Sequence, residues 1–165
     1  MAFAVPPFFF LTLTMKEQLK AVAEFHKAFK QKDGKWPQPL EKSEYVLRHA
    51  LMKEENDEYL EACKKNSLVE IADALGDQLY ILCGTILKHG MQDVILDVFN
   101  EIQASNMSKL GPDGQPIFRE DGKILKGPEY FKPNLSKFIN QPYEEKENEN
   151  WIQWSGVIYQ LCVRR

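Results

Sequence analysis

The sequence predicts an all-α protein with a four-helix bundle-type core, and three observations support this. Apolar residues recur at helical spacing in four successive segments, breaker runs rich in glycine and proline separate them, and no series of alternating strand patterns is present. With 165 residues, one domain can bury a core without disulfides or structural metals. Because one chain offers few long helices to shield a polar centre, we expect a homodimer or homotetramer that completes the bundle.

Capping and breaker signals delimit the expected helices. Capping-box patterns begin at Thr14 and Ser67, where a hydroxyl and a glutamate three residues later can satisfy free backbone amides. The run 32–39 contains a glycine and two prolines, and Gly90 and Gly111 follow the third and fourth periodic segments. We therefore expect helices over about 15–31, 43–65, 68–88 and 91–109.

The remaining segments are less regular. Residues 111–133 read as a long loop with a hairpin turn at 119–123, and together with the four helices they form an expected domain over 15–133. Residues 1–14 are nearly all apolar, but they lack Lys and Arg and are too short to span a bilayer. Residues 134–165 are first polar and acidic and then rich in tryptophan. Both extensions are left unassigned.

Charge and cysteine content exclude several classes of protein. The formal net charge is −3, so no extended basic surface can bind nucleic acid by counterion release. An odd number of cysteines, three, with no CxxC pair argues against a disulfide framework and against a zinc site. We expect a cytoplasmic protein without a membrane partner, although the apolar extension at 1–14 leaves other compartments open.

The third expected helix carries an unusual line of acids. It contains no Lys or Arg from Leu68 to Leu87 and is apolar around most of its circumference, which predicts a buried helix. Its only charges are Glu70, Asp73 and Asp77, spaced three and four residues apart. All three therefore lie on one narrow stripe.

The second expected helix has acids on its inner face. Glu54, Glu55 and Glu58 occupy positions that the periodicity of Leu47 and Leu51 reserves for the interior. Burial of unpaired carboxylates costs on the order of several kcal/mol each, so the pattern calls for cations that neutralise them. Clustered carboxylate oxygens suit Mg²⁺ or Mn²⁺ rather than zinc. The alternative is a solvated face balanced by lysines four residues away, to which we assign Asp57 and Glu61.

Two acidic motifs resemble a known family. Glu54-Glu55-Asn-Asp-Glu58 followed by Glu70-Ile-Ala-Asp73 resembles the EExxE and ExxD motifs of the all-α nucleoside triphosphate pyrophosphohydrolases, which include MazG-like enzymes, phosphoribosyl-ATP pyrophosphohydrolases and dimeric dUTPases. The resemblance implies a MazG-like core in which Glu54 activates water as the catalytic base. It also implies that divalent ions, Mg²⁺ or in its place Mn²⁺, are held by Glu55, Glu58, Glu70 and Asp73.

A second block of motifs extends the resemblance. Ser105-Asn-Met-Ser-Lys109 and Lys126-Gly-Pro-Glu-Tyr130 resemble segments that bind phosphate and cover the nucleotide in these enzymes. Asn106 and Lys109 could grip phosphate oxygens, Lys126 could add positive charge, and Tyr130 could stack on a base. Lys109 also suits a helix C-terminus whatever its function. For Asp77, a structural hydrogen bond and a contact with metal or substrate both stay open.

The resemblance implies a metal-dependent enzyme that hydrolyses a nucleoside triphosphate. It would cleave the α–β phosphoanhydride to give a nucleoside monophosphate and pyrophosphate, in a site between the second, third and fourth helices. One alternative is a phosphoribosyl-ATP pyrophosphohydrolase, which shares the metal site but takes a larger substrate. An alternative of another class is a non-catalytic helical adaptor whose acids bind a cation structurally.

Overall fold

The protein is all-α, as the sequence predicts. The computed structural model describes residues 15–139, so the expectations for 1–14, for the Thr14 cap and for 140–165 lie outside the described residues. The helices are α1 (Met15–Ala28), α2 (Lys42–Lys64), α3 (Leu68–Lys88), α4 (Ile95–Met107) and the short α5 (Ser136–Ile139). Between residues 15 and 139 the only extended pairing is an isolated bridge from Phe118 to Ile124.

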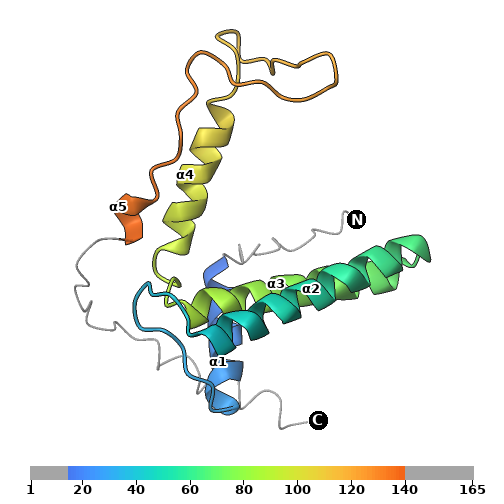
Figure 1. Ribbon diagram of the computed structural model, residues 1–165, viewed down its shortest axis with the longest axis vertical. Coiled ribbons are helices and arrows are strands. Elements are labelled where there is room, and N and C mark those ends of the chain that lie inside the picture. The colour runs from blue at the N-terminus through green and yellow to red at the C-terminus, as the bar shows by residue number, and fades with distance from the viewer. Residues whose placement is uncertain (1–14, 140–165) are drawn as a thin grey trace, which may run out of the picture.

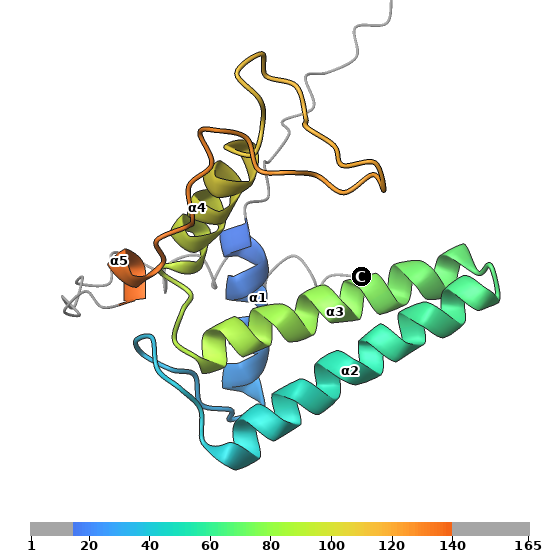
Figure 2. The same ribbon diagram turned by 45° about the horizontal axis from the view of Figure 1, so that its top comes forward.

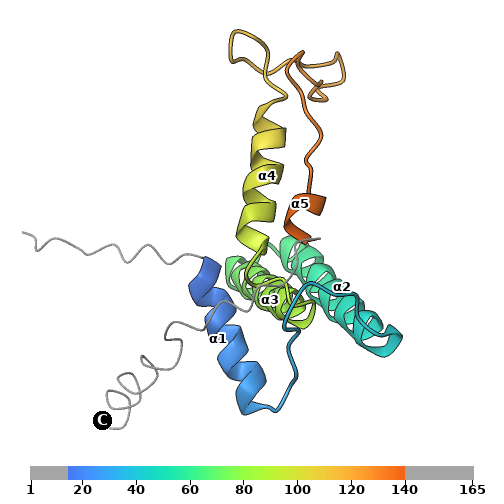
Figure 3. The ribbon, with the colours of Figure 1, turned by 90° about the vertical axis from the view of Figure 1, so that its left-hand side faces the viewer.

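The helices form two parts (Figure 1). The first, which we call the body, consists of α1, α2 and α3: α2 and α3 run side by side as a hairpin, and α1 crosses α3. The second, which we call the arm, comprises residues 95–139 and projects from the body, with the loop after α4 at its far end (Figures 2 and 3). Within one chain, α4 therefore does not join the other helices in a closed four-helix bundle.

The short connection between α2 and α3 leads into the predicted N-cap of α3. Ser67 is the N-cap of α3, and its hydroxyl accepts a hydrogen bond from the Glu70 amide at 3.3 Å. The reciprocal bond of a capping box is absent, because the Ser67 amide donates to the Ala62 carbonyl and the Glu70 carboxylate accepts from Lys65 at 2.9 Å. Asn66 turns the chain with a φ of 54°. The sequence therefore predicted the cap correctly but not the partner of the glutamate.

The apolar core lies where α1 crosses the C-terminal half of α3. Leu19 and Val22 of α1 form a buried cluster with Cys83, Ile86 and Leu87 of α3. The N-terminal half of α3 has no such cover, and Leu68 and Val69 are 80% and 81% exposed. The sequence predicted that the whole of α3 is buried. Within one chain this is confirmed only in part, because α1 covers only one end of α3.

A buried polar group ties α2 to α3 beside this core. Arg48 is 9% exposed, and its Nε donates to Thr85 Oγ1 at 2.9 Å while its Nη2 donates to the Ile81 carbonyl at 2.6 Å. His26 of α1 is also buried and pairs with Asp33 through Nδ1 at 2.5 Å. Leu47, which the sequence placed on the inner stripe, is 57% exposed. The helix is rotated so that Arg48 faces α3 in its place.

Local backbone geometry sets the other helix ends. α1 ends at Ala28, before the expected residue 31, because Lys30 adopts a φ of 56°. α4 begins at Ile95 rather than near Met91, because residues 91–94 form turns. The predicted end of α3 at Lys88 is confirmed, and the predicted turn at 119–123 closes with a bond from the Arg119 amide to the Lys123 carbonyl.

None of the helices described between residues 15 and 139 combines the length and the apolar character that crossing a membrane requires.

Gly84 lies at the point where α1, α2 and α3 meet, and its substitution tests that contact. A Cβ there would lie 2.9 Å from Arg48 Nη2 and 3.3 Å from His26 Nε2, and the Arg48 side chain is pinned by its hydrogen bonds. We expect Gly84→Ala to lower the free energy of unfolding by roughly 1–3 kcal/mol in urea titrations. Gly76→Ala, in the same helix with open space around it, should raise the free energy by about 0.5–1 kcal/mol. Equal effects of the two changes would contradict this packing.

Candidate functional site

Five of the predicted acids gather along the α2–α3 hairpin. The Oε2 atom of Glu55 is buried and has no hydrogen-bond partner among the described residues. The pKa of Glu55 is raised, first by burial and then by the negative charges of Asp77, Glu58, Glu54 and Asp73. The structure thus brings acids of both motifs to one place, which we call the acidic cluster: Glu54, Glu55, Glu58, Asp73 and Asp77.

The acidic cluster has no cationic partner within residues 15–139. The nearby lysines pair with other acids: Lys53 with Asp57, and Lys64 with Glu61 at 2.7 Å. Both pairs are exposed, so the assignment of Asp57 and Glu61 to a solvated face is confirmed. Any cation beside the acidic cluster would therefore come from outside residues 15–139.

Glu70 lies apart from this cluster. Its carboxylate pairs with Lys65 and is about half exposed, and its charge is not among those that raise the pKa of Glu55. An exposed ion pair of this kind contributes little to stability, so the carboxylate can exchange its partner at little cost. Its role as a metal ligand stays a prediction.

The acidic cluster fits a divalent cation by its chemistry rather than by preformed geometry. No group of three or more described His, Cys, Asp or Glu side chains is close enough together to hold an ion. Nevertheless, the buried and unpartnered Oε2 of Glu55 is a free hard donor, and carboxylate oxygens are what Mg²⁺ and Mn²⁺ prefer. Side-chain rotations of the exposed Glu58 and Asp73 would be needed to complete a coordination shell.

The four predicted residues of the second block gather elsewhere, on the arm. Lys109 Nζ donates to Asn106 Oδ1 at 2.8 Å, and the Gly127 amide donates to the Lys109 carbonyl at 2.9 Å. Lys126 Nζ lies 4.2 Å from the centre of the Tyr130 ring. We call Asn106, Lys109, Lys126 and Tyr130 the arm cluster. It lies around the C-terminal end of α4, which is the end of that helix away from the body (Figures 1 and 3).

The two clusters do not meet within one chain. The helix pairs with extensive contact are α2 with α3 and α1 with α3, whereas α4 packs extensively on neither helix of the hairpin. The expectation of one site enclosed by the second, third and fourth helices is therefore not met by a single copy. Periodicity in the sequence places residues on a helix face but does not give the direction in which that helix leaves the body.

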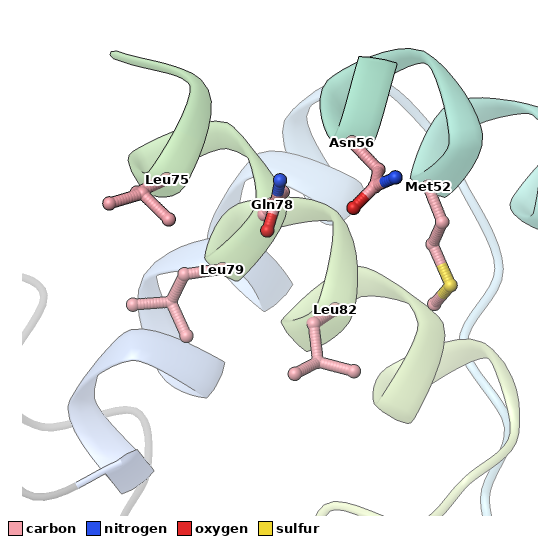
Figure 4. A pocket seen from close by; sticks show the side chains of 6 residues that line it. All are labelled: Met52, Asn56, Leu75, Gln78, Leu79 and Leu82. Carbon is pink, nitrogen blue, oxygen red and sulfur yellow. The ribbon is translucent and has the colours of Figure 1, made fainter. Parts of the chain in front are cut away.

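Sequence reasoning missed an apolar pocket on the hairpin (Figure 4). Its volume is about 380 Å³, and it is lined by Met52, Asn56, Leu75, Gln78, Leu79 and Leu82. Gln78 also links the helices, since its Nε2 donates to the Glu55 carbonyl at 3.1 Å. Leu75 and Leu79 are offset from Asp73 and Asp77 around α3, so the pocket opens on a different face from the acids. That offset is visible in the sequence and could have indicated the pocket.

A group of aromatic rings beside the acidic cluster was also missed. Phe25 of α1 contacts Phe29 with ring centres 4.3 Å apart and meets Tyr80 of α3 edge-on at 5.8 Å. All three rings are at least 38% exposed. Tyr80 is one helical turn beyond Asp77 on the same stripe. The rings offer an exposed aromatic surface next to the acids.

Comparison with known proteins places the acidic helices in a family. Residues 22–106, more than half of the chain, match the family model described as phosphoribosyl-ATP pyrophosphohydrolase. A crystal structure of a provisionally assigned NTP pyrophosphohydrolase from Exiguobacterium sp. 255-15 has 26% sequence identity, and the match covers 70% of this chain and 88% of that chain with a TM-score of 0.36. No curated protein matches. The family match includes both acidic motifs and Asn106.

The raised pKa of Glu55 predicts how this residue affects stability. Above the raised pKa the native state holds an ionised, partly buried carboxylate among like charges, and this penalty disappears as the pH falls through the raised pKa toward the ordinary value. In metal-free buffer at pH 7, Glu55→Gln should therefore raise the free energy of unfolding by roughly 1 kcal/mol. The difference in the free energy of unfolding between Glu55→Gln and the wild type should become smaller at acid pH and on addition of Mg²⁺.

Glu61→Gln is the matched control for this prediction, because Glu61 is exposed and already paired with Lys64. Urea titrations at pH 7 and at acid pH should show a change within about 0.5 kcal/mol for this variant. If Glu55→Gln lowered stability at pH 7 without metal, the assignment of electrostatic repulsion at Glu55 would be wrong.

Proposed function

Since the chain belongs to the phosphoribosyl-ATP pyrophosphohydrolase family, a branch of the all-α NTP pyrophosphohydrolases, we propose that it is a metal-dependent pyrophosphohydrolase of nucleoside triphosphates. It would cleave the α–β phosphoanhydride and release a nucleoside monophosphate and pyrophosphate. The observation that carries this proposal is the acidic cluster on α2 and α3, with an unpartnered buried oxygen on Glu55 and no cation beside it among residues 15–139.

The residues that would hold the metal are Glu55, Glu58, Glu70 and Asp73. Glu55 is the anchor of this set, because its buried oxygen has no other partner and lies among like charges. Glu70 would first leave Lys65, which its exposed position allows. Bound Mg²⁺ supplies Lewis acidity: it offsets the charge of the phosphates and lowers the pKa of water.

Glu54 would act as the general base. It is exposed, yet close enough to Glu55 for its charge to raise the pKa of that group, so it lies at the edge of the cluster where water has access. The Glu54 carboxylate takes a proton from water as the water oxygen bonds to the α- or the β-phosphorus. The bridging P–O bond then breaks, and the bond electrons leave with the departing phosphate oxygen.

The rest of the substrate would be held by the predicted binding residues. Asn106, Lys109 and Lys126 present an amide and two ammonium groups of the kind that bind phosphate oxygens. Tyr130 would stack on the base, and the exposed rings of Phe25 and Tyr80 offer a second aromatic surface beside the acids. Asp77 belongs to the acidic cluster, which favours a role near metal or substrate over a purely structural one.

A homodimer or homotetramer is part of the proposal. α3 exposes large apolar residues along much of its length, and no other described part of the chain covers them: Leu68, Val69, Leu75, Leu79 and Leu82. A contiguous apolar surface of this kind is typical of an interface between subunits.

Phosphoribosyl-ATP is the second candidate substrate, and the family match over residues 22–106 favours it. Its hydrolysis needs the same acids and the same bond cleavage, but a larger binding region. The helical adaptor stays as the non-catalytic alternative, in which the acidic cluster binds a cation and no nucleotide is hydrolysed.

Substitutions in the acidic cluster test the catalytic assignment. Glu54→Gln should lower kcat by about 10²–10⁴-fold through loss of the base, and Glu55→Gln and Asp73→Asn should each abolish measurable turnover. Pyrophosphate release in the presence of Mg²⁺ or Mn²⁺ is the readout, with Glu61→Gln as a control that keeps wild-type activity. Near-normal rates for both Glu55→Gln and Asp73→Asn would refute the site.

A substrate panel separates the candidate functions. With Mg²⁺, the protein should release pyrophosphate from at least one standard or damaged nucleoside triphosphate, and chromatography should identify the monophosphate product. Turnover of phosphoribosyl-ATP alone would establish the second candidate instead. Saturable binding of Mg²⁺ without turnover of any of these compounds would support the adaptor.

A further inference from the structure

One of the predicted metal ligands already has a cation beside it. Lys65 Nζ lies 2.9 Å from Glu70 Oε2, and the two side chains are 61% and 50% exposed. Among the ion pairs within residues 15–139, this is the only one that engages a carboxylate of the predicted metal set. The proposed function requires the same carboxylate for a metal ion.

Glu70 lies nearer to the connection between α2 and α3 than the acidic cluster does. Gln78 Nε2 donates to the Glu55 carbonyl at 3.1 Å, so residues 55 and 78 lie side by side on the two helices. Glu70 is about two helical turns closer to the connection than Gln78, toward the free end of the hairpin (Figure 2). Its charge is not among those that raise the pKa of Glu55, whereas the charge of Asp73 is. Glu70 therefore lies outside the cluster that it is expected to join.

Backbone hydrogen bonds hold the connection that carries Lys65. The Lys65 amide donates to the Glu61 carbonyl at 3.1 Å, and the Ser67 amide donates to the Ala62 carbonyl at 3.2 Å. The Ser67 hydroxyl caps α3 by accepting from the Glu70 amide at 3.3 Å. The Lys65 side chain takes part in none of these bonds. The connection therefore fixes the backbone of Lys65 and of Glu70 without help from their ion pair.

The Glu70 carboxylate is left with two possible cations. In a capping box it would accept from the Ser67 amide, but that amide is bonded to the Ala62 carbonyl. Lys65 precedes α3, whereas Asp73 lies about one turn beyond Glu70 on the same stripe. The ammonium and an ion beside Asp73 would therefore draw the carboxylate in opposite directions along α3, so it serves one of them at a time.

We propose that Lys65 is a stand-in cation that competes with the metal for Glu70, an inference that rests on the proposed function. Without metal, the ammonium holds Glu70 toward the connection and away from Asp73. On metal binding, Glu70 leaves Lys65 and turns toward Asp73, and the ammonium is released into water. Only chains in which Glu70 is free offer the complete ligand set, so the apparent Kd for metal rises by the inverse of their fraction. Lys65 thus sets the metal concentration at which the site fills.

Removal of the ammonium tests the competition. Lys65→Gln keeps a polar side chain but removes the positive charge, and the backbone bonds of the connection should keep the variant folded. In calorimetric titrations of metal-free protein, we expect the Kd for Mn²⁺ to fall by about two- to five-fold, the range that an exposed ion pair allows. The Mg²⁺ concentration at half-maximal turnover should fall by the same factor.

Lys64→Gln is the matched control. Lys64 is the neighbouring residue and is exposed like Lys65, but its partner Glu61 lies outside the predicted metal set. Both variants remove one positive charge from the same end of the hairpin, so they share any general effect of net charge. At about 0.15 M ionic strength, the Kd of Lys64→Gln for Mn²⁺ should stay within about 1.5-fold of the wild-type value. A larger fall in Kd for Lys65→Gln than for Lys64→Gln supports the competition.

A second pair of variants shows whether Lys65 acts through Glu70. Glu70→Gln should weaken Mn²⁺ binding by at least about ten-fold, because a ligand is lost. In that background, adding Lys65→Gln should change the Kd no more than adding Lys64→Gln does. If Lys65→Gln tightened binding equally with and without Glu70, or if Glu70→Gln bound Mn²⁺ like the wild type, the competition would be overturned.

Turnover separates this inference from the proposed function. A wild type that binds Mn²⁺ but releases no pyrophosphate from any nucleotide would overturn the proposed function, while the Kd values of the variants would still decide the competition. An active wild type whose Lys65→Gln variant binds Mn²⁺ no more tightly than Lys64→Gln would overturn the competition alone.

Discussion

The repulsion among carboxylates on the α2–α3 hairpin is the constraint on which the rest of the structure depends. Glu55 is held between α2 and α3 with one oxygen buried and unpartnered, and four other acids lie close enough to raise its pKa. A helix pair of this kind would gain stability if apolar residues replaced the acids. The arrangement makes physical sense as a site that acquires its missing positive charge on binding.

Contacts at both ends of the hairpin, together with the Gln78 hydrogen bond to the Glu55 carbonyl in its middle, hold this unfavourable arrangement together. At one end the Ser67 hydroxyl caps α3, and at the other Arg48 donates to Thr85 and to the Ile81 carbonyl while α1 crosses beside it. The compact apolar core also lies at that second end. The acids and the apolar pocket lie in the middle of the hairpin, and large apolar residues of α3 stay exposed.

The local structure could be predicted from the sequence, but the arrangement of its parts could not. Hydrophobic period and the Ser67 cap placed α2 and α3 within a residue or two, and the EExxE and ExxD motifs indicated the acids that gather between them. The hydrophobic periodicity of α2 could not show that Arg48 rather than Leu47 faces α3. That orientation depends on the hydrogen-bond acceptors that α3 contributes to Arg48. Nor could it show that Glu70 pairs with Lys65, or that α4 leads away from the hairpin, since both follow from tertiary geometry.

The most direct test of the account is a titration of metal-free protein with Mn²⁺, followed by the electron paramagnetic resonance signal of the free ion. Wild-type protein should show saturable binding that weakens as the pH falls and Glu55 takes up a proton. Glu55→Gln should lose most of this binding, while Glu61→Gln should keep it. Absence of saturable binding to the wild type, or equal affinity of the wild type and Glu55→Gln, would contradict the claim that the clustered acids form a cation site.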